Sequence, residues 1–318
     1  MDLISLYYFS ELAKTLHITK TAERLYITQQ TLSNHIARLE EYFDIPLFYR
    51  SPSLSLTPAG EQVLAFAKSV NREHTNLMDI LSDMKEQESG VLRVGGSTVR
   101  VHNFMPHILP QFTARYPKVD VQFFSSMKAK DGPDQLEENL DYALVVYDDR
   151  NPNIIARHLA NDQIYLCVPD RLLQKYYGTE SDALKCRSEH GANIADFAKL
   201  PFCISFNHIG HKVSACFQEA QVTPWAYITS DQTQLSIAAC FEGLVAAFVT
   251  HIFLLDQQEQ IPDDINIFPL LYKGEPLVQN VSLIRRKDRY LPHYGKYFLE
   301  LLFRYYSEIE HIHMDRIV

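Results

Sequence analysis

Seven polar side chains near the amino terminus have the composition of a surface that recognises nucleotide bases. They are Gln29, Gln30, Thr31, Ser33, Asn34, His35 and Arg38. Gln and Asn hydrogen-bond to adenine edges, Ser and Thr to several bases, and the methyl group of Thr contacts thymine. A solvated helix usually carries Glu and Lys instead, so this face favours a helix lying in the major groove of DNA.

Two helices joined by a tight turn would position that face, within the segment TKTAERLYITQQTLSNHIARLEE (residues 19–41). The first helix turns Ala22 and Leu25 inward, the chain breaks at residues 26–27, and Thr28 is placed to cap the second helix. The apolar stripe of the second helix recurs at i, i+4 and i+7: Leu32, Ile36 and Leu39. Amphipathic helices of this kind are common, so a helical hairpin with a polar surface is the alternative.

The flanking residues predict the rest of a small domain. Residues 2–15 form a helix whose inward face supports the reading helix: Leu3, Leu6, Tyr7, Phe9, Ser10 and Ala13. After a turn at Asp44 and Pro46, leucine alternates with serine over residues 53–56, which predicts a short β-hairpin, or wing. Arg50 near its base either contacts phosphate or the minor groove or pairs with Glu41 or Asp44. The predicted DNA contacts are Thr28, Gln29, Gln30, Thr31, Ser33, Asn34, Arg38, Arg50, Ser51 and Ser53.

A long helix opened by Pro58 follows, over residues 59–88. Its apolar residues have the spacing of a coiled-coil seam interrupted at residues 73–74: Val63, Phe66, Ala67, Val70, Leu77, Ile80, Leu81 and Met84. A lone helix cannot bury such a stripe. A partner helix from a second copy is the favoured solution, and packing within one chain is the alternative.

The first 60 residues resemble the winged helix-turn-helix of LysR-type transcriptional regulators, and the rest of the chain resembles that family more weakly. The matching positions are Tyr8-Phe9, Ala22, Leu25, Gln29, Leu32, Ser33, Ile36, Leu39-Glu40, Pro46-Leu47-Phe48, Arg50, Leu56-Thr57 and Ala59-Gly60. Two positions depart from the family pattern. Gln30 stands where the family often has Pro or Ser, and Asn34 stands where it often has Arg. The resemblance implies an antiparallel dimer of linker helices.

From residue 90 the composition changes to short β-rich runs separated by helical segments, which predicts a parallel α/β sheet. The predicted strands are 91–95, 119–124, 142–147, 164–169, 202–206, 226–230 and 278–286. The predicted helices are 104–115, 133–139, 170–177, 210–220, 232–241 and 292–311. The resemblance implies two subdomains of the periplasmic-binding-protein type. Residues 178–199 are longer than the family pattern and have no predicted place.

Ligands bind at the carboxyl ends of strands in open α/β sheets, where helix N-termini present free N–H groups. Gly95 and Gly96 allow close backbone approach, which favours a small anion such as a carboxylate, and the resemblance puts effector contacts at these positions. Capping is the alternative role for each hydroxyl, and Arg100 pairs either with a ligand or with a surface acid. The predicted effector contacts are Ser97, Thr98, Arg100, Ser125, Ser126, Val146, Tyr147, Phe206, Asn207 and His208.

Composition narrows the class of protein further. The 318 residues carry a net charge of −9, and the first 60 hold five basic against six acidic side chains, so we expect few ionic contacts with DNA. Five scattered cysteines predict reduced thiols in the cytoplasm, and no run predicts a signal peptide or membrane span. No motif predicts a cofactor, a metal site or an enzyme; the histidine pairs 208/211 and 311/313 favour solvated or capping roles.

Three domains are therefore predicted: a winged helix-turn-helix domain (1–58), a linker dimerisation helix (59–89) and an effector-binding domain (90–318). The last divides into subdomain I (91–161 and 267–318) and subdomain II (162–266). We expect a transcriptional regulator that binds double-stranded promoter DNA as a homodimer or homotetramer and responds to a small effector, with RNA polymerase a candidate partner. The alternative is a cytoplasmic small-molecule receptor or enzyme whose first 88 residues mediate assembly.

Overall fold

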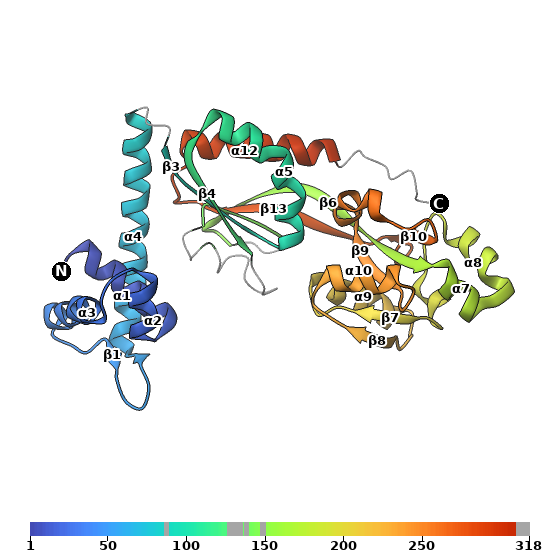
Figure 1. Cartoon of the computed structure of the whole chain (residues 1–318), viewed down its shortest axis with the longest axis horizontal. Coiled ribbons are helices and arrows are strands. Elements are labelled where there is room, and N and C mark those ends of the chain that lie inside the picture. Colours follow the sequence, from blue (N-terminus) through green and yellow to red (C-terminus); the bar gives the residue numbers. More distant parts are fainter. Residues whose placement is uncertain (86–88, 126–135, 137–139, 147–150, 310–318) are drawn as a thin grey trace. The chain divides into compact units, whose positions relative to one another are not determined.

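The structure, a computed structural model, describes residues 1–85, 89–125, 136, 140–146 and 151–309 (Figure 1). The chain forms two compact units. The first comprises residues 1–88 and 289–292, and the second comprises residues 89–288 and 293–318.

The first unit begins with the predicted winged helix-turn-helix. Helices α1 (Leu3–Thr15), α2 (Ile18–Arg24) and α3 (Gln29–Phe43) are followed by strands β1 (Phe48–Tyr49) and β2 (Ser55–Leu56), which pair antiparallel (Figure 1). One core holds them together: Leu6, Phe9, Leu12, Ala22, Leu32, Ile36, Leu39, Leu47 and Phe48. The predicted stripe of α3 is thus confirmed.

The buried face of α1 differs from the prediction. Leu6 and Phe9 are buried as expected, but Leu3 and Tyr7 are exposed, and Leu12 is buried in the core. The stripe that faces the core runs through Ser5, Phe9 and Leu12 at i, i+4 and i+7, and a helix places Leu3 and Tyr7 on the neighbouring stripe.

The turn between α2 and α3 follows the predicted break. Tyr26 adopts a left-handed conformation with φ of 55°. Thr28 caps α3, because its hydroxyl accepts a hydrogen bond from the Thr31 N–H at 3.0 Å. The cap satisfies one of the backbone donors that a helix leaves free at its start.

The long helix α4 (Pro58–Met84) uses its apolar residues in two ways. Val63, Ala67 and Val70 pack against the core of the helix-turn-helix, so this half of the predicted seam is covered within the chain. Leu77, Leu81 and Met84 are 52%, 39% and 76% exposed. The seam is therefore not one continuous surface for a partner helix.

Residues 289–292 of the first unit, which follow the last strand in sequence, pack against the second half of α4. Arg289 forms an ion pair with Asp79 at 2.6 Å and donates to the Asn76 side-chain oxygen at 2.8 Å. Tyr290 donates its hydroxyl to Asp83 at 2.9 Å. The side chains of Arg289 and Asp79 are only 9% and 11% exposed, so the pair is largely shielded from solvent.

We predict that Arg289→Met and Asp79→Leu each destabilise the first unit by about 3–5 kcal/mol, because each leaves a shielded charge unpaired. The double variant should lose less than the sum of the two, since it leaves neither charge behind. Urea unfolding followed by circular dichroism measures the three free energies. Strictly additive losses would contradict a coupled pair.

Subdomain I of the second unit is a sheet covered by helices. Its strands are β3 (Ser89–Gly96), β4 (Lys118–Ser125), β5 (Tyr142–Val146), the first half of β6 (Ile154–Pro169) and β13 (Val278–Arg286). Helices α5 (Thr98–Arg115) and α12 (His293–Ile309) contact each other beside it (Figure 1). Strand β3 pairs parallel with β4 and β5, but β13 runs antiparallel to β5 and β6. The sheet is mixed: the predicted parallel pairing is confirmed for β3, β4 and β5, and it is wrong for β13.

Subdomain II is built on the second half of β6. That half pairs antiparallel with β9 (Ala247–Thr250) and β10 (Ile265–Pro269), and β7 (Pro201–Ile204) pairs parallel with β8 (Trp225–Thr229). The helices are α7 (Asp170–Tyr177), α8 (Ser181–Ser188), α9 (His208–Glu219), α10 (Thr233–Phe241) and α11 (His251–Asp256), with 3₁₀ turns at Gly178–Glu180, Ile194–Phe197 and Gln258–Gln260. Strands β9 and β10 were not predicted. Residues 178–199, for which no structure was predicted, contain α8 and the 3₁₀ turns on either side of it.

The chain returns to subdomain I later than predicted. Ile267 pairs with Cys167 in subdomain II, and the hairpin of β11 (Leu271–Tyr272) and β12 (Glu275–Pro276) follows. Leu277 still belongs to the subdomain II core. The crossing therefore falls at residues 277–278 rather than at 267. Most of the predicted helix at 133–139 lies outside the described residues.

Candidate functional site

The exposed face of α3 carries the side chains predicted to read DNA. Residues Thr28, Gln29, Gln30, Asn34 and Arg38 are exposed, and Thr31 and Ser33 are half-buried. None of them points into the core of the first unit. His35 does not belong to this face, because its Nδ1 lies 2.8 Å from the Ser5 hydroxyl and its ring packs edge-on against Tyr8.

Two of these side chains form a hydrogen bond with each other. Gln30 donates its amide N–H to the Asn34 amide oxygen at 2.9 Å, one turn along α3. An i, i+4 pair of this kind holds both amides on one side of the helix. They present the remaining donor and acceptor groups to the outside together.

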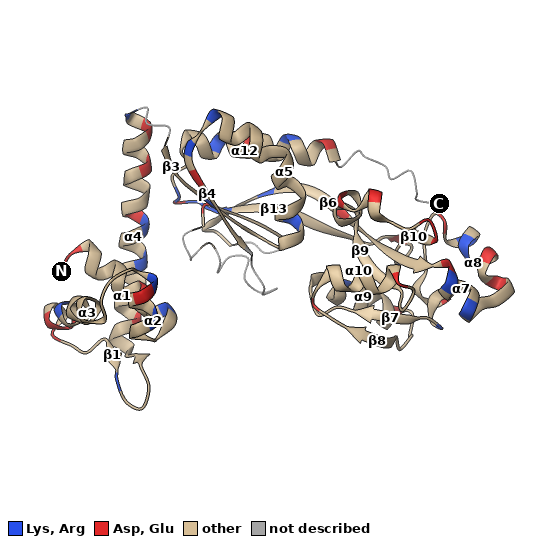
Figure 2. Cartoon of the chain, in the orientation of Figure 1, with Lys and Arg blue, Asp and Glu red and all other residues tan. Residues whose placement is uncertain are grey.

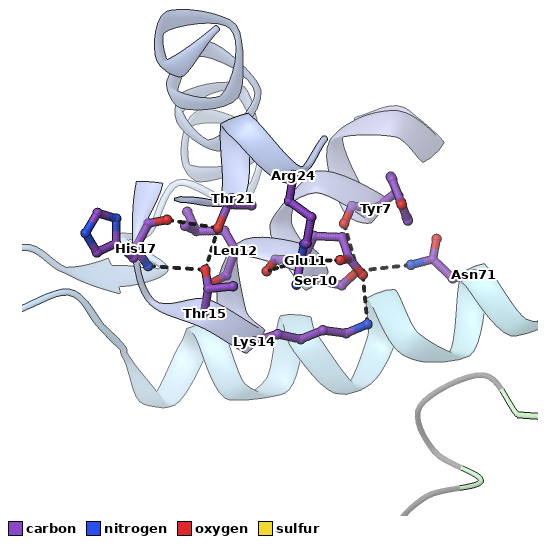
Figure 3. A network of polar contacts seen from close by, with 10 residues as sticks. All are labelled: Tyr7, Ser10, Glu11, Leu12, Lys14, Thr15, His17, Thr21, Arg24 and Asn71. Carbon is purple, nitrogen blue, oxygen red and sulfur yellow. Dashed lines mark hydrogen bonds and ion pairs between the residues drawn. The ribbon is translucent and has the colours of Figure 1, made fainter. Parts of the chain in front are cut away.

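Most basic side chains of the domain are neutralised within it. Lys14 and Arg24 both pair with Glu11 in the polar network between α1, α2 and α4 (Figure 3). Acidic and basic positions are interspersed along α1, α2 and α3 (Figure 2). Among the residues that the structure describes, Arg38 and Lys20 have no such ion pair. Lys20 was not among the predicted DNA contacts.

Glu40 connects the end of α3 to the wing. One carboxylate oxygen accepts hydrogen bonds from the backbone N–H groups of Leu47 and Phe48 at 2.8 and 3.3 Å, and the other pairs with Arg50 at 3.0 Å. Arg50 therefore pairs with Glu40, not with the predicted Glu41 or Asp44. Its side chain stays 72% exposed. Ser51 and Ser53 are exposed in the loop between β1 and β2.

We predict that Arg38→Gln lowers the slope of log affinity for DNA against log salt by about one, as expected when one phosphate contact is lost. Arg24→Gln is the matched control, because that guanidinium is already bound to Glu11. Fluorescence anisotropy with a promoter fragment at several salt concentrations measures both slopes. Equal slopes for wild type and Arg38→Gln would place Arg38 away from the phosphates.

A cleft of about 1040 Å³ lies between the two subdomains of the second unit. Seven residues of the predicted effector set line it: Ser97, Thr98, Arg100, Val146, Phe206, Asn207 and His208. Ser125 is the last residue of β4, and its side chain lies outside the described part of the structure. Ser126 and Tyr147 lie outside the described residues.

Two helices begin at the cleft. Ser97 caps α5 by accepting a hydrogen bond from the Arg100 N–H, and Asn207 caps α9 by accepting one from the Gly210 N–H at 3.2 Å. Both side chains thus have the capping role that was the alternative, and both also line the cleft. The partial positive charge of a helix N-terminus favours an anionic group nearby.

The floor of the cleft contains a buried carboxylate that sequence reasoning missed. Asp162 accepts hydrogen bonds from the Ile252 N–H and from the Gln279 side-chain amide, both at 3.0 Å. Burial raises the pKa of Asp162, and these hydrogen bonds together with the charge of Arg100 oppose the rise. The only signal in the sequence is that polar Asp162 and Gln279 interrupt otherwise β-rich segments.

Thr229, Ser230, Asp231, Gln232, Thr233, Gln234 and Thr250 also line the cleft and were missed. Thr229 and Thr250 are the last residues of β8 and β9, and residues 230–234 connect β8 to the first turn of α10. Only Thr250 belongs to a strand that was not predicted. Among the described residues, no group of three His, Cys, Asp or Glu side chains could hold a metal ion. No helix within the described residues is long and apolar enough to cross a bilayer.

A winged helix-turn-helix joined to a ligand-binding α/β domain defines a DNA-binding regulator, and comparison with known proteins agrees. The model of the bacterial regulatory helix-turn-helix protein, lysR family, matches residues 3–61, and that of the LysR substrate binding domain matches residues 85–306. The chain belongs to the LysR family of transcriptional regulators. It is a DNA-binding regulator with an effector-binding domain.

Individual relatives cover nearly the whole chain. The HTH-type transcriptional activator IlvY of Salmonella typhimurium is 24% identical over 277 residues, which is 84% of this chain and 88% of that protein. A full-length OxyR variant from Pseudomonas aeruginosa has a TM-score of 0.68 at 18% identity, over 96% of this chain and 95% of that one. Full-length CbnR complexed with its target DNA has a TM-score of 0.60 at 20% identity, over 96% and 99%. The named relatives are transcriptional regulators, which excludes the enzyme alternative.

Proposed function

We propose that this regulator reads its operator through the exposed face of α3, assisted by the wing, and that an effector in the cleft between the subdomains controls promoter occupancy. The observation that carries the proposal is the composition of α3. From Gln29 to Arg38 the helix has no carboxylate, although acids are favoured in a first helical turn. The absence of acids there suits a surface that approaches phosphates.

The cleft is the proposed effector site because both subdomains line it. Ser97 and Arg100 come from subdomain I, and Asn207 and Asp231 come from subdomain II. A small molecule bound to both has a different affinity for each arrangement of the subdomains. That difference in affinity is the only way in which binding can shift the equilibrium between arrangements.

The proposed active form is a homo-oligomer, either a dimer or a tetramer, in the cytoplasm. The support is the exposed apolar surface of α4, which Leu77, Leu81 and Met84 form at i, i+4 and i+7. Five thiols without a disulfide agree with a reducing compartment. RNA polymerase is the proposed partner at promoters, because a regulator of transcription acts on the enzyme that transcribes.

We predict that Leu77→Glu together with Leu81→Glu lowers the oligomeric state, because two charges would be buried in the proposed helix–helix contact. Leu244→Glu is the control, since this exposed leucine lies in subdomain II. Sedimentation velocity at micromolar protein concentration measures the mass. An unchanged mass for the double variant would remove α4 from the interface.

The test of DNA reading uses Gln29→Ala and Asn34→Ala. Each should weaken operator binding by about 1–3 kcal/mol and relax specificity at one base position, as expected when a direct base contact is lost. Gln62→Ala, an exposed glutamine of α4, is the matched control. Binding is measured against a panel of operators with single base changes. Equal losses on every sequence would contradict direct base reading by these two residues.

A further inference from the structure

The cleft contains a buried hydrogen-bond acceptor without a partner. Gln279 lies on β13 with only 2% of its surface exposed, and it donates its amide N–H to Asp162. Its amide oxygen has no hydrogen-bond partner among the described residues. A buried acceptor of this kind costs free energy unless a donor meets it. The residue lines the cleft, so a bound molecule can supply that donor.

The same cleft contains a cation without a carboxylate partner. Arg100 lines the cleft close to the start of α5, and its Nε is buried with no hydrogen-bond partner among the described residues. Within the described residues, its guanidinium forms no ion pair with a carboxylate. A guanidinium in this state offers two parallel N–H donors to a carboxylate.

The acidic side chains of the cleft disfavour a ligand whose charged groups are all negative. Asp162 and Asp231 both line it, and Asp162 lies within electrostatic range of Arg100. Asp162 already accepts hydrogen bonds from the Ile252 N–H, the Gln279 amide and the Thr250 hydroxyl. An ionised carboxylate has about four acceptor positions, so one remains for a donor on the ligand. A second carboxylate on the ligand would face these acids, whereas an ammonium group would satisfy them.

We propose that the effector is an α-amino acid or a close relative of one. Its carboxylate binds Arg100 and the N-terminus of α5, and its ammonium group donates to the Gln279 amide oxygen and to Asp162. This inference rests on the proposed use of the cleft as the effector site. A second hollow, of about 260 Å³ beside α9, has no charged side chain in its lining and does not suit such a ligand.

The test measures thermal shift and titration calorimetry of the full-length protein with each of the twenty standard L-amino acids. At least one should raise the melting temperature. For each that does, the N-acetyl, deaminated and carboxamide analogues should bind at least about tenfold more weakly, because each loses one charge-assisted contact. Succinate, which has two carboxylates and no amine, should not bind.

Arg100→Gln should weaken binding of the active amino acid at least about tenfold, as expected for loss of a charge-assisted hydrogen bond. Gln279→Leu should also weaken it and should restore some affinity for the deaminated analogue. Arg187→Gln, an exposed arginine of α8 outside the cleft, is the matched control. Circular dichroism establishes that the variants are folded. If Gln279→Leu does not fold, the comparison of the analogues on the wild-type protein decides alone.

The outcomes separate this inference from the proposed function. If no amino acid binds, or if succinate or a deaminated acid binds as well as the amino acid, the amino-acid inference is overturned. In that case a metabolite anion that binds in an Arg100-dependent manner and alters operator occupancy leaves the cleft as the effector site. If operator occupancy responds to nothing that depends on Arg100, the cleft itself is the wrong site.

Discussion

The arrangement of strands and helices in the second unit depends on the hydrogen bonds that one buried carboxylate accepts. Asp162 lies in β6, the strand that pairs with β13 in subdomain I through its first half and with β9 and β10 in subdomain II through its second half. Its two oxygens accept hydrogen bonds from the start of α11 and from Gln279 on β13. Asn103 of α5 in turn binds the Ile252 carbonyl and the Tyr305 hydroxyl of α12, at 3.2 and 2.7 Å. A polar network thus joins β6 and β13 to α11, α5 and α12, and three of its members, Asp162, Ile252 and Gln279, line the cleft.

In the first unit, α4 is the element that contacts both the helix-turn-helix core and residues 289–290. The first half of α4 is covered by the helix-turn-helix core, and Asn71 donates to the Ser10 hydroxyl of α1 at 3.3 Å (Figure 3). The second half holds residues 289–290 through Asn76, Asp79 and Asp83. Asn76, Asp79 and Asp83 recur at i, i+3 and i+7, so they form one face of this half of α4, and the exposed Leu77, Leu81 and Met84 form the neighbouring face.

Local signals in the sequence predicted much of this structure. The stripe of α3, the cap at Thr28 and the bounds of α7 depend on residues close together in the chain, and they were found. The antiparallel β13, strand β10 and the late crossing at residues 277–278 depend on pairing between segments about a hundred residues apart, which periodicity does not encode. Asp162 and Gln279 were missed for the same reason, since their partners come from distant elements. His35 was assigned to the wrong face of α3, and Arg50 was paired with Glu41 instead of Glu40, because successive residues of a helix point in directions about 100° apart and the sequence pattern does not resolve them.

The charge of the first unit constrains how it can bind DNA. Glu11 neutralises Lys14 and Arg24, and Glu40 holds Arg50 while fixing the base of the wing. Few cations remain for phosphates, so one copy gains little of the nonspecific, salt-dependent attraction on which many DNA-binding proteins rely. In the proposed regulator, the affinity comes from base contacts made by α3 and from joining two such faces on one duplex, because a second linked face binds at high effective concentration. In the proposed regulator, oligomerisation and base reading are therefore parts of one energetic requirement, and an effector that changes the arrangement of two copies acts on the larger share of the binding free energy.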